Sequence, residues 1–539
     1  MTGQSHVTFR SRGNPGEKHT AAEPLTSQKH CSLSAESGEP PVRLGACCSS
    51  LLSDLATVTA GVAVAPLLML TTCILCGVPA LHRLLHPRRD FLDGVSSAWI
   101  NHAPGAAIHA VMISKTPVDA AKVFAKFNKI YVNSARSEFV RFKQRIVRSC
   151  CFWPYWTDIT QPLDTAYHFR SRPDMITKDG LDEFLGQVQS ELLDFDRPVW
   201  QLWHFGNFVD ENGKACSATM LRMHHAMADG FTALRAMMQG AEPMKPPDTG
   251  FTRSPSSRSE QRPKISFFRK FHYVLAAVRK LVLMRNDSVS VFKGSALLGA
   301  EDPRVVAWSA LKDISVNDLK AAGRSLGDAS INDILLTALT AAFQTYAEQS
   351  SEAKLPKHIT ASMWVSLSPL NQIYKDFDEL PFRWSNSGLG TVYVKLPVGN
   401  KEDPRQLLQS TIAMTRDPAL MLEAGVATSI LMVMGWMPRT LFRPIWNLIA
   451  NKVSTSMSNI PGPQFAMEWI GIPLRCILFF VPPVGTVSLF VTIATFNGEV
   501  TLGLGGDSRV FRSDALRRIS EEFFPAEMQS LVRRNSASS

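Results

Sequence analysis

The sequence predicts an α/β protein built from two lobes, and three observations support this prediction. Its 539 residues are enough for two domains or for one large two-lobed unit. Short apolar segments typical of strands alternate with segments of helical periodicity over most of the chain. Between residues 242 and 264 the composition shifts to proline, serine and arginine, as in a linker. We therefore expect a first lobe over residues 90–245, a linker and crossover helix over 246–300, and a second lobe over 301–525.

The first 85 residues differ in composition from both lobes. Residues 1–50 are rich in small, polar and charged side chains, which predicts a disordered tail. Within residues 51–85, the stretch 55–81 carries no charged side chain and is long enough to span or anchor in a membrane. Pro66 and several glycines and threonines weaken a helix there, so a buried core helix is the alternative.

Arginines close to the apolar stretch predict its orientation. Arg83, Arg88 and Arg89 follow it, whereas only Arg43 precedes it at a similar distance. By the positive-inside tendency the two lobes are cytosolic. The nine cysteines agree, because their spacing gives no disulfide framework. We expect the endoplasmic reticulum membrane as the location, with the lipid droplet as a second location.

The first lobe is expected to hold strands and helices in alternation. Asp210-Glu211-Asn212-Gly213 is a turn sequence between two apolar segments and predicts a hairpin. The expected elements, in order, are a strand at 106–113, a helix at 118–131, a strand at 164–169, a helix at 179–193, and strands at 200–208 and 215–225. A basic, aromatic helix at 265–284 follows the linker, either lying on a membrane surface or clamping the two lobes together.

The second lobe repeats the alternation with more apolar segments. Ser315 is a plausible helix N-cap. The stretch 425–453 is apolar but broken by Pro438, Arg439 and Arg443, so we expect a pair of interfacial or core helices there. The other expected elements are helices at 314–322, 334–346 and 512–524, and strands at 359–367, 389–396, 476–481, 489–496 and 499–504, all within this lobe.

The net charge of +10 suggests binding to anionic partners. No nucleic-acid-binding motif accompanies the charge, so we expect no nucleic acid. Membrane lipid and phosphate-bearing substrates are the expected anionic partners.

A histidine pair stands at the end of the strand predicted for 215–225. His224 and His225 follow this apolar segment, and Asp229-Gly230 then provides a turn before a helix. If both histidines keep strand geometry, their side chains point to opposite faces. One can then serve as a base in a cleft while the other is held in the scaffold. Two buried core histidines are the alternative; a zinc site is disfavoured because adjacent residues chelate poorly and no third ligand stands nearby.

The pattern His-His-x-x-x-Asp-Gly resembles the motif of the CoA-dependent acyltransferase superfamily, which includes chloramphenicol acetyltransferase and condensation domains. Five further blocks resemble the wax ester synthase/diacylglycerol acyltransferase family and occur in its order. They lie at 196–200, 330–333, 364–367 (with Trp364 where proline is usual), 386–397 and 458–463. The resemblance covers about residues 95–525 and implies two chloramphenicol-acetyltransferase-like lobes around a central channel.

The resemblance also implies roles for individual residues. His225 is expected to be the general base, Asp229 to orient the loop, and His224 to be more structural than catalytic. Gly230 is expected to allow close approach of the backbone. The remaining expected substrate-binding residues are Asn332, Ser456 and Asn459. Asp333 is expected to belong to the scaffold, and Ser454-Thr455-Ser456 is either an oxyanion-stabilising hydroxyl cluster or plain turn chemistry, which we favour.

The expected reaction joins a fatty acyl group from acyl-CoA to a fatty alcohol or diacylglycerol. Acyl-CoA is a co-substrate, and neither a cofactor nor a metal is expected. Acylation of a sterol or short-chain alcohol is the alternative within enzymes. A lipid-binding relative without activity is the alternative outside them.

Overall fold

The computed structural model divides the chain into residues 1–68 and 69–539, and every residue described below belongs to the second unit. The described ranges are 89–102, 105–148, 153–244, 275–281, 283–299, 301–350, 355–367, 378–386, 388–399, 401–481 and 485–533, with a few isolated positions besides. The predictions for residues 1–50 and 55–76, and most of that for 265–284, lie outside the described residues.

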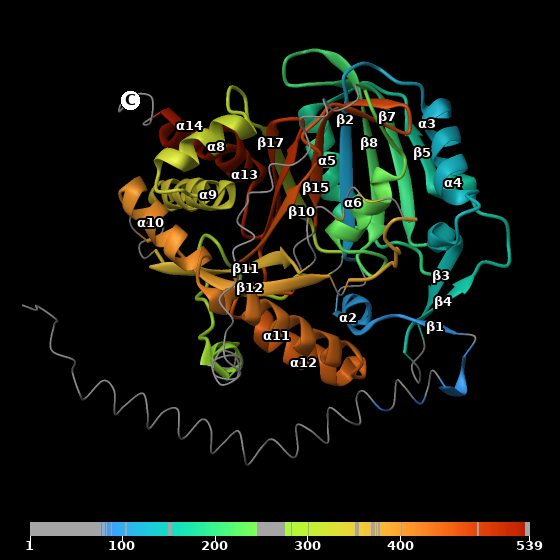
Figure 1. The fold of residues 1–539 in the computed structure, drawn as a ribbon, viewed down its shortest axis with the longest axis horizontal. Coiled ribbons are helices and arrows are strands. Elements are labelled where there is room, and N and C mark those ends of the chain that lie inside the picture. The colour runs from blue at the N-terminus through green and yellow to red at the C-terminus, as the bar shows by residue number, and fades with distance from the viewer. Residues whose placement is uncertain are drawn as a thin grey trace, which may run out of the picture. The chain divides into compact units, whose positions relative to one another are not determined.

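Two large sheets and one small sheet form the framework, with helices packed around them (Figure 1). The eight-stranded sheet comprises β2 (Ala107–Ser114), β5 (Phe169–Arg172), β6 (Ile176–Thr177), β7 (Trp200–Val209), β8 (Ala215–His224), β9 (Ala241–Pro243), β14 (Met467–Trp469) and β15 (Ile472–Phe480). The six-stranded sheet comprises β10 (Arg304–Ala310), β11 (His358–Ser366), β12 (Leu389–Pro397), β13 (Thr455–Pro461), β16 (Leu489–Phe496) and β17 (Glu499–Asp507). The small sheet holds β1 (Asp90–Phe91), β3 (Gln144–Val147) and β4 (Tyr155–Asp158).

The predicted helices that lie within the described residues are present, and helices at 94–102, 165–168 and 404–415 occur in addition. In chain order, the helices are α2 (Gly94–His102), α3 (Ala120–Phe127), α4 (Thr165–His168), α5 (Lys178–Gln189), α6 (Gly230–Met238), α8 (Val316–Ser325), α9 (Ile331–Glu348), α10 (Pro404–Thr415), α11 (Pro418–Gly435), α12 (Arg439–Ala450), α13 (Ser513–Arg517) and α14 (Phe524–Arg533). Ser315 and Ser330 each form a capping box, which satisfies N–H groups at the starts of α8 and α9.

Local chemistry fixes the hairpin that carries the histidines. β7 and β8 pair antiparallel across the predicted turn. In this turn Asp210 Oδ1 accepts hydrogen bonds from the backbone N–H groups of Asn212 (2.9 Å) and Lys214 (2.8 Å). Gly213 has a φ of +75°, which glycine adopts without strain. The prediction of a hairpin at this turn is confirmed.

Two predicted strands differ in the structure. Residues 165–168 form the short helix α4 rather than a strand, because the Asp164 side chain caps it by accepting from Tyr167 N. The strand predicted at 476–481 belongs to β15, which pairs antiparallel with β2 in the first lobe's sheet. Its assignment to the second lobe is therefore wrong. The predicted final helix also continues beyond residue 524 to Arg533.

β15 joins the two large sheets. The Thr501 hydroxyl of β17 donates to Ile477 O (2.8 Å), and the Thr492 hydroxyl of β16 donates to Phe479 O. Next to this junction, β13 pairs parallel with both β11 and β16. Thr455 and Ser456 thus lie in a buried strand, and the turn predicted for them is wrong.

The backbones of α2 and α11 approach each other closely. A Cβ added to Gly94 would overlap the backbone of Met432, and a Cβ added to Gly435 would overlap the backbone of Gly94. Only residues without a side chain allow the two backbones this proximity. The contact places Trp99 of α2 beside the cavity that α11 borders.

Candidate active site

The two histidines leave β8 with different surroundings. His224 N donates to Val199 O (2.9 Å), whereas His225 N donates to Ala106 O (2.8 Å), so neighbours on opposite sides hold the two backbone groups. His224 is buried; its Nδ1 accepts from Ala226 N (3.0 Å), and its ring meets Phe195 edge-on. The His225 ring instead forms part of a cavity wall. Of the pair, His225 is the one placed to meet a substrate.

Asn386 and Trp99 hold the His225 ring. The ring stacks on the Trp99 indole with 3.9 Å between centroids, and its Nδ1 lies 3.2 Å from Asn386 Oδ1. Asn386 Nδ2 donates to His225 O (2.7 Å) and to Ser96 Oγ (3.0 Å). With both of its N–H groups directed at oxygens, Asn386 presents its carbonyl oxygen to the ring. Nδ1 is then the protonated nitrogen, and the lone pair is on Nε2.

Burial keeps His225 neutral. The imidazole is enclosed, and this loss of hydration lowers its pKa to about 4, although the hydrogen bonds to its own carbonyl and to Asn386 oppose the shift. Near pH 7 the ring is therefore uncharged and able to accept a proton.

Asp229 supports the site through helix α6. It is the N-cap of this helix, and its Oδ1 accepts from Thr232 N (2.7 Å). Burial raises the pKa of Asp229 to about 6. Thr232 Oγ1 in turn donates to Ser385 O (3.1 Å), and the Arg235 guanidinium donates to Pro381 O (3.3 Å). The capped helix thus holds the segment that carries Asn386 against His225.

Two cavities adjoin each other near the histidine motif, and His225 lines the smaller of them. The smaller, of about 410 Å³, is lined by Trp99, Ile108, His225, Gly230, Trp364, Leu389, Ser458, Ile460, Phe479, Val481, Phe490 and Thr492. The larger, of about 720 Å³, is lined mainly by apolar side chains of α11, α12 and the six-stranded sheet. Trp99, Trp364 and Phe490 belong to the walls of both, so the cavities are neighbours.

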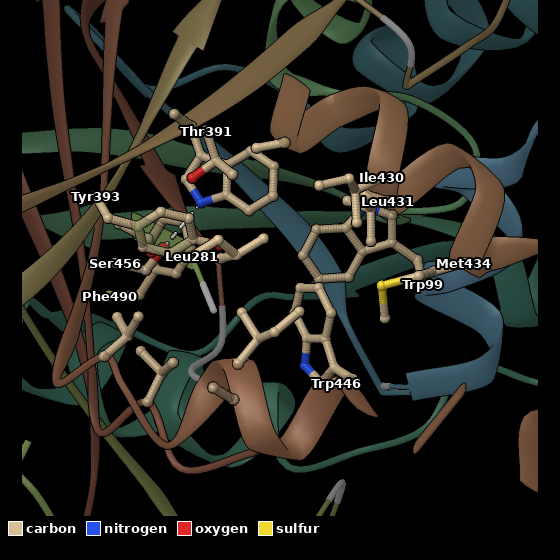
Figure 2. A pocket seen from close by; sticks show the side chains of 17 residues that line it. Trp99, Leu281, Thr391, Tyr393, Ile430, Leu431, Met434, Trp446, Ser456 and Phe490 are labelled. Carbon is tan, nitrogen blue, oxygen red and sulfur yellow. Dashed lines mark hydrogen bonds between the residues drawn. The ribbon is translucent and has the colours of Figure 1, made fainter. Parts of the chain in front are cut away.

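Figure 2 shows how the larger cavity is built. Ile430 and Met434 of α11 and Trp446 of α12 surround the same space as Trp99 of α2. The Ser456 hydroxyl also lies at this wall, where it accepts from Trp364 Nε1 (2.9 Å) and from Ser362 Oγ (2.9 Å). The space next to the smaller cavity is therefore large and mostly apolar.

The structure brings some of the predicted substrate-binding residues to these cavities and leaves others outside. Gly230 lines the smaller cavity and Ser456 the larger. Asn459 Nδ2 donates to Asn332 Oδ1 where β13 meets the start of α9, and neither residue lines the two described cavities. Asp333 belongs to the capping box of α9. In the described ranges, no three His, Cys, Asp or Glu side chains gather as a metal site would require.

Sequence reasoning did not single out Asn386 or Trp99 as site residues. Asn386 is the first residue of the family-like block at 386–397, so the sequence marks this position but does not indicate its contact with His225. Trp99 stands in no such block, and only its stacking on His225 identifies it.

Comparisons with known proteins identify the family. The family model named "Wax ester synthase/diacylglycerol acyltransferase catalytic domain" matches residues 101–335, and "WS/DGAT C-terminal domain" matches residues 384–524. Wax ester synthase/diacylglycerol acyltransferase 1 of Arabidopsis thaliana is 21% identical over 372 residues, which cover 64% of this chain and 74% of that one. A Mycobacterium tuberculosis protein whose name marks it as a candidate diacylglycerol O-acyltransferase is 23% identical over 410 residues, covering 68% of this chain and 75% of that one.

Solved structures agree on the fold. The wax ester synthase/diacylglycerol acyltransferase from Marinobacter aquaeolei VT8 superposes with a TM-score of 0.55 and 16% identity, over 83% of this chain and all of that one. The first condensation domain of the calcium-dependent antibiotic synthetase superposes with a TM-score of 0.50 and 14% identity, over 82% of this chain and 96% of that one. The predicted two-lobed α/β fold is confirmed. The chain belongs to the wax ester synthase/diacylglycerol acyltransferase family.

Proposed function

We propose that this protein transfers a fatty acyl group from acyl-CoA to the hydroxyl group of a fatty alcohol or a diacylglycerol. The observation that carries the proposal is a neutral His225 whose Nδ1 is engaged by Asn386 and whose ring faces a cavity beside a large apolar one. The names of the relatives support the same substrates.

The reaction follows from the placement of the base. His225 Nε2 takes the proton of the acceptor hydroxyl while its oxygen attacks the thioester carbonyl carbon. When the tetrahedral intermediate collapses, the carbon–sulfur bond breaks and the imidazolium returns the proton to the CoA thiolate. The products are an ester and free CoA. The thioester already carries the activated acyl group, so acyl-CoA is a co-substrate and no further cofactor takes part.

The larger cavity favours long chains. Each methylene that enters an apolar site gains about 0.8 kcal/mol, or roughly a fourfold change in binding. Its walls of Ile430, Met434 and Trp446 offer this gain to an alkyl chain. A sterol or a short alcohol as acceptor is the second candidate, and it would leave most of this wall unused.

An acceptor screen tests the proposal. Purified protein given palmitoyl-CoA with hexadecanol or diacylglycerol is expected to form a neutral ester and to release free CoA, both measured by mass spectrometry. Turnover of acetyl-CoA or short alcohols, with none of either long-chain acceptor, would reject the substrate and keep the mechanism. Lipid binding without turnover of any acceptor would favour a non-catalytic relative.

Membrane association and location belong to the proposal as well. The uncharged stretch 55–81 and the arginines after it support an anchor in the endoplasmic reticulum membrane or at a lipid droplet, with the lobes in the cytosol. Among the described residues, no single helix is long and apolar enough to cross a bilayer; α10 and α11 meet that test only as a pair bent by 59°.

Removal of residues 1–85 tests the anchor. The truncated protein is expected to fold, because β1 (Asp90–Phe91) and every later strand of the three sheets are kept, and to pellet less firmly with membranes in high salt. The measurement is the membrane-bound fraction before and after a salt wash. Equal retention of the truncated and full-length proteins would place the anchor elsewhere.

A further inference from the structure

Helix α12 has two apolar sides with different surroundings. On its inner side Phe442 is buried in the core, and Trp446, Ile449 and Ala450 line the larger cavity. On its outer side the exposed apolar side chains are those of Leu441 (60% exposed), Ile445 (38%) and Leu448 (62%). Spacings of four and three residues place these three side chains in one stripe. A single helix therefore separates the cavity from an apolar outer surface.

A second element beside the cavity exposes apolar side chains in the same way. Leu281 lines the larger cavity, whereas Val278 (38% exposed) and Leu283 (64%) are open to solvent. Lys452 Nζ donates to Met284 O (2.6 Å), which ties this element to the end of α12. Exposed apolar side chains thus border the cavity on two sides, as expected of a site of interaction rather than of scattered surface residues.

The two charged side chains of α12, Arg439 and Arg443, are both basic. Arg439 and Arg443 are exposed on α12, and Arg439 lies within electrostatic range of both Arg443 and Arg148. None of the ion pairs that join described residues involves these three arginines. Leucines flanked by arginines that form no ion pair with another described residue match an anionic lipid surface, in which acyl chains lie beneath phosphate groups.

We propose that the outer α12 surface, formed by Leu441, Ile445, Leu448, Arg439 and Arg443, docks on an anionic phospholipid bilayer. The lipid acceptor then passes from the bilayer into the larger cavity beside α12, a step that rests on the proposed function. A second copy of this chain fits less well, because a twofold contact through the stripe brings the same arginines together. In a bilayer the leucines contact acyl chains and the arginines contact phosphate groups.

The test compares acceptor delivery from two sources in the full-length protein. Leu441→Ser/Leu448→Ser is assayed with diacylglycerol in phosphatidylcholine/phosphatidylserine vesicles and with diacylglycerol in detergent micelles. Loss of two interfacial leucines is expected to lower the vesicle rate by roughly tenfold and to leave the micelle rate within about twofold of the parent. The matched control is Leu192→Ser/Leu297→Ser, whose side chains are exposed (44% and 50%) and do not line the cavity. It is expected to keep both rates.

The arginines are tested separately. Arg439→Gln/Arg443→Gln is expected to abolish the increase in vesicle rate that phosphatidylserine gives over pure phosphatidylcholine. Equal vesicle rates for the leucine variant and its control, or an undiminished effect of phosphatidylserine in the arginine variant, would overturn the proposal.

A readout independent of turnover separates docking from catalysis. Benzoylphenylalanine at position 448 is expected to form photocrosslinks to lipid in these vesicles, and the same group at position 297 is not. Crosslinks from position 448 to a second protein chain, or none to lipid, would overturn the docking surface. Crosslinking to lipid without turnover in vesicles or micelles would reject the proposed function and keep the docking surface.

Discussion

Replacing His225 by alanine is expected to lower the transfer rate by roughly 100-fold or more, because removal of a general base typically costs an enzyme this much. The variant keeps the fold, because the ring contributes to a cavity wall rather than to the strand pairing of β8. The measurement is CoA release under single-turnover and steady-state conditions, with thermal unfolding to verify the fold.

His224→Asn is the matched control. An asparagine oxygen can replace the acceptor that His224 Nδ1 offers to Ala226 N, so a well-folded protein with a rate near that of the parent is expected. Near-normal turnover by a folded His225→Ala protein would remove His225 from the mechanism.

Replacing Asn386 by leucine is the second large effect that we expect. Leucine has a similar size but cannot accept from His225 Nδ1, so the ring loses its fixed tautomer and orientation. A general base that is present but poorly oriented loses part of its contribution, and we expect kcat to fall by roughly tenfold or more. The leucine also removes the donors to His225 O and Ser96 Oγ, so rate alone cannot separate positioning from stability.

The pH profile separates them. The pKa of His225 is about 4, so the neutral base predominates above that pH and kcat/KM of the parent is expected to be flat from about pH 7 to 8, above the pKa of about 6 of Asp229. In Asn386→Asp the new carboxylate stabilises the imidazolium, raises the pKa of His225 and moves the acidic limb towards neutral pH. Arg383→Gln, an exposed change on the same segment, leaves the limb in place. An unmoved limb in Asn386→Asp would contradict a positioning role for Asn386.

Local chemistry explains which parts of the fold the sequence could predict. Asp210 and Gly213 define the β7–β8 turn whatever surrounds it, and Ser315 caps α8 with its own neighbours. β15 was assigned to the wrong lobe because an apolar strand buried on both faces reads the same in either sheet. Its partner β2 lies more than three hundred residues earlier in the chain, and no local pattern records that pairing.

The site divides in the same way. The spacing of His225, Asp229 and Gly230 is local and can be read from the sequence. The contact between His225 and Asn386 joins residues 161 positions apart, and α6 helps to hold the second segment in place. Asn332 and Asn459 were expected in the channel, yet their side chains contact each other outside the two described cavities.

The contact of Gly94 with α11 limits how this enzyme can be re-engineered. Because the two backbones touch, α11 cannot shift towards α2 without moving it, and α2 carries both Trp99 and Ser96. A change of chain-length preference made by repositioning the helix would therefore misplace the base. Exchanges of side-chain size at Ile430 or Met434 alter the volume and leave the helix axes where they are. In this chain, substrate range can thus be changed through single side chains, while the spacing of these two helices stays constant.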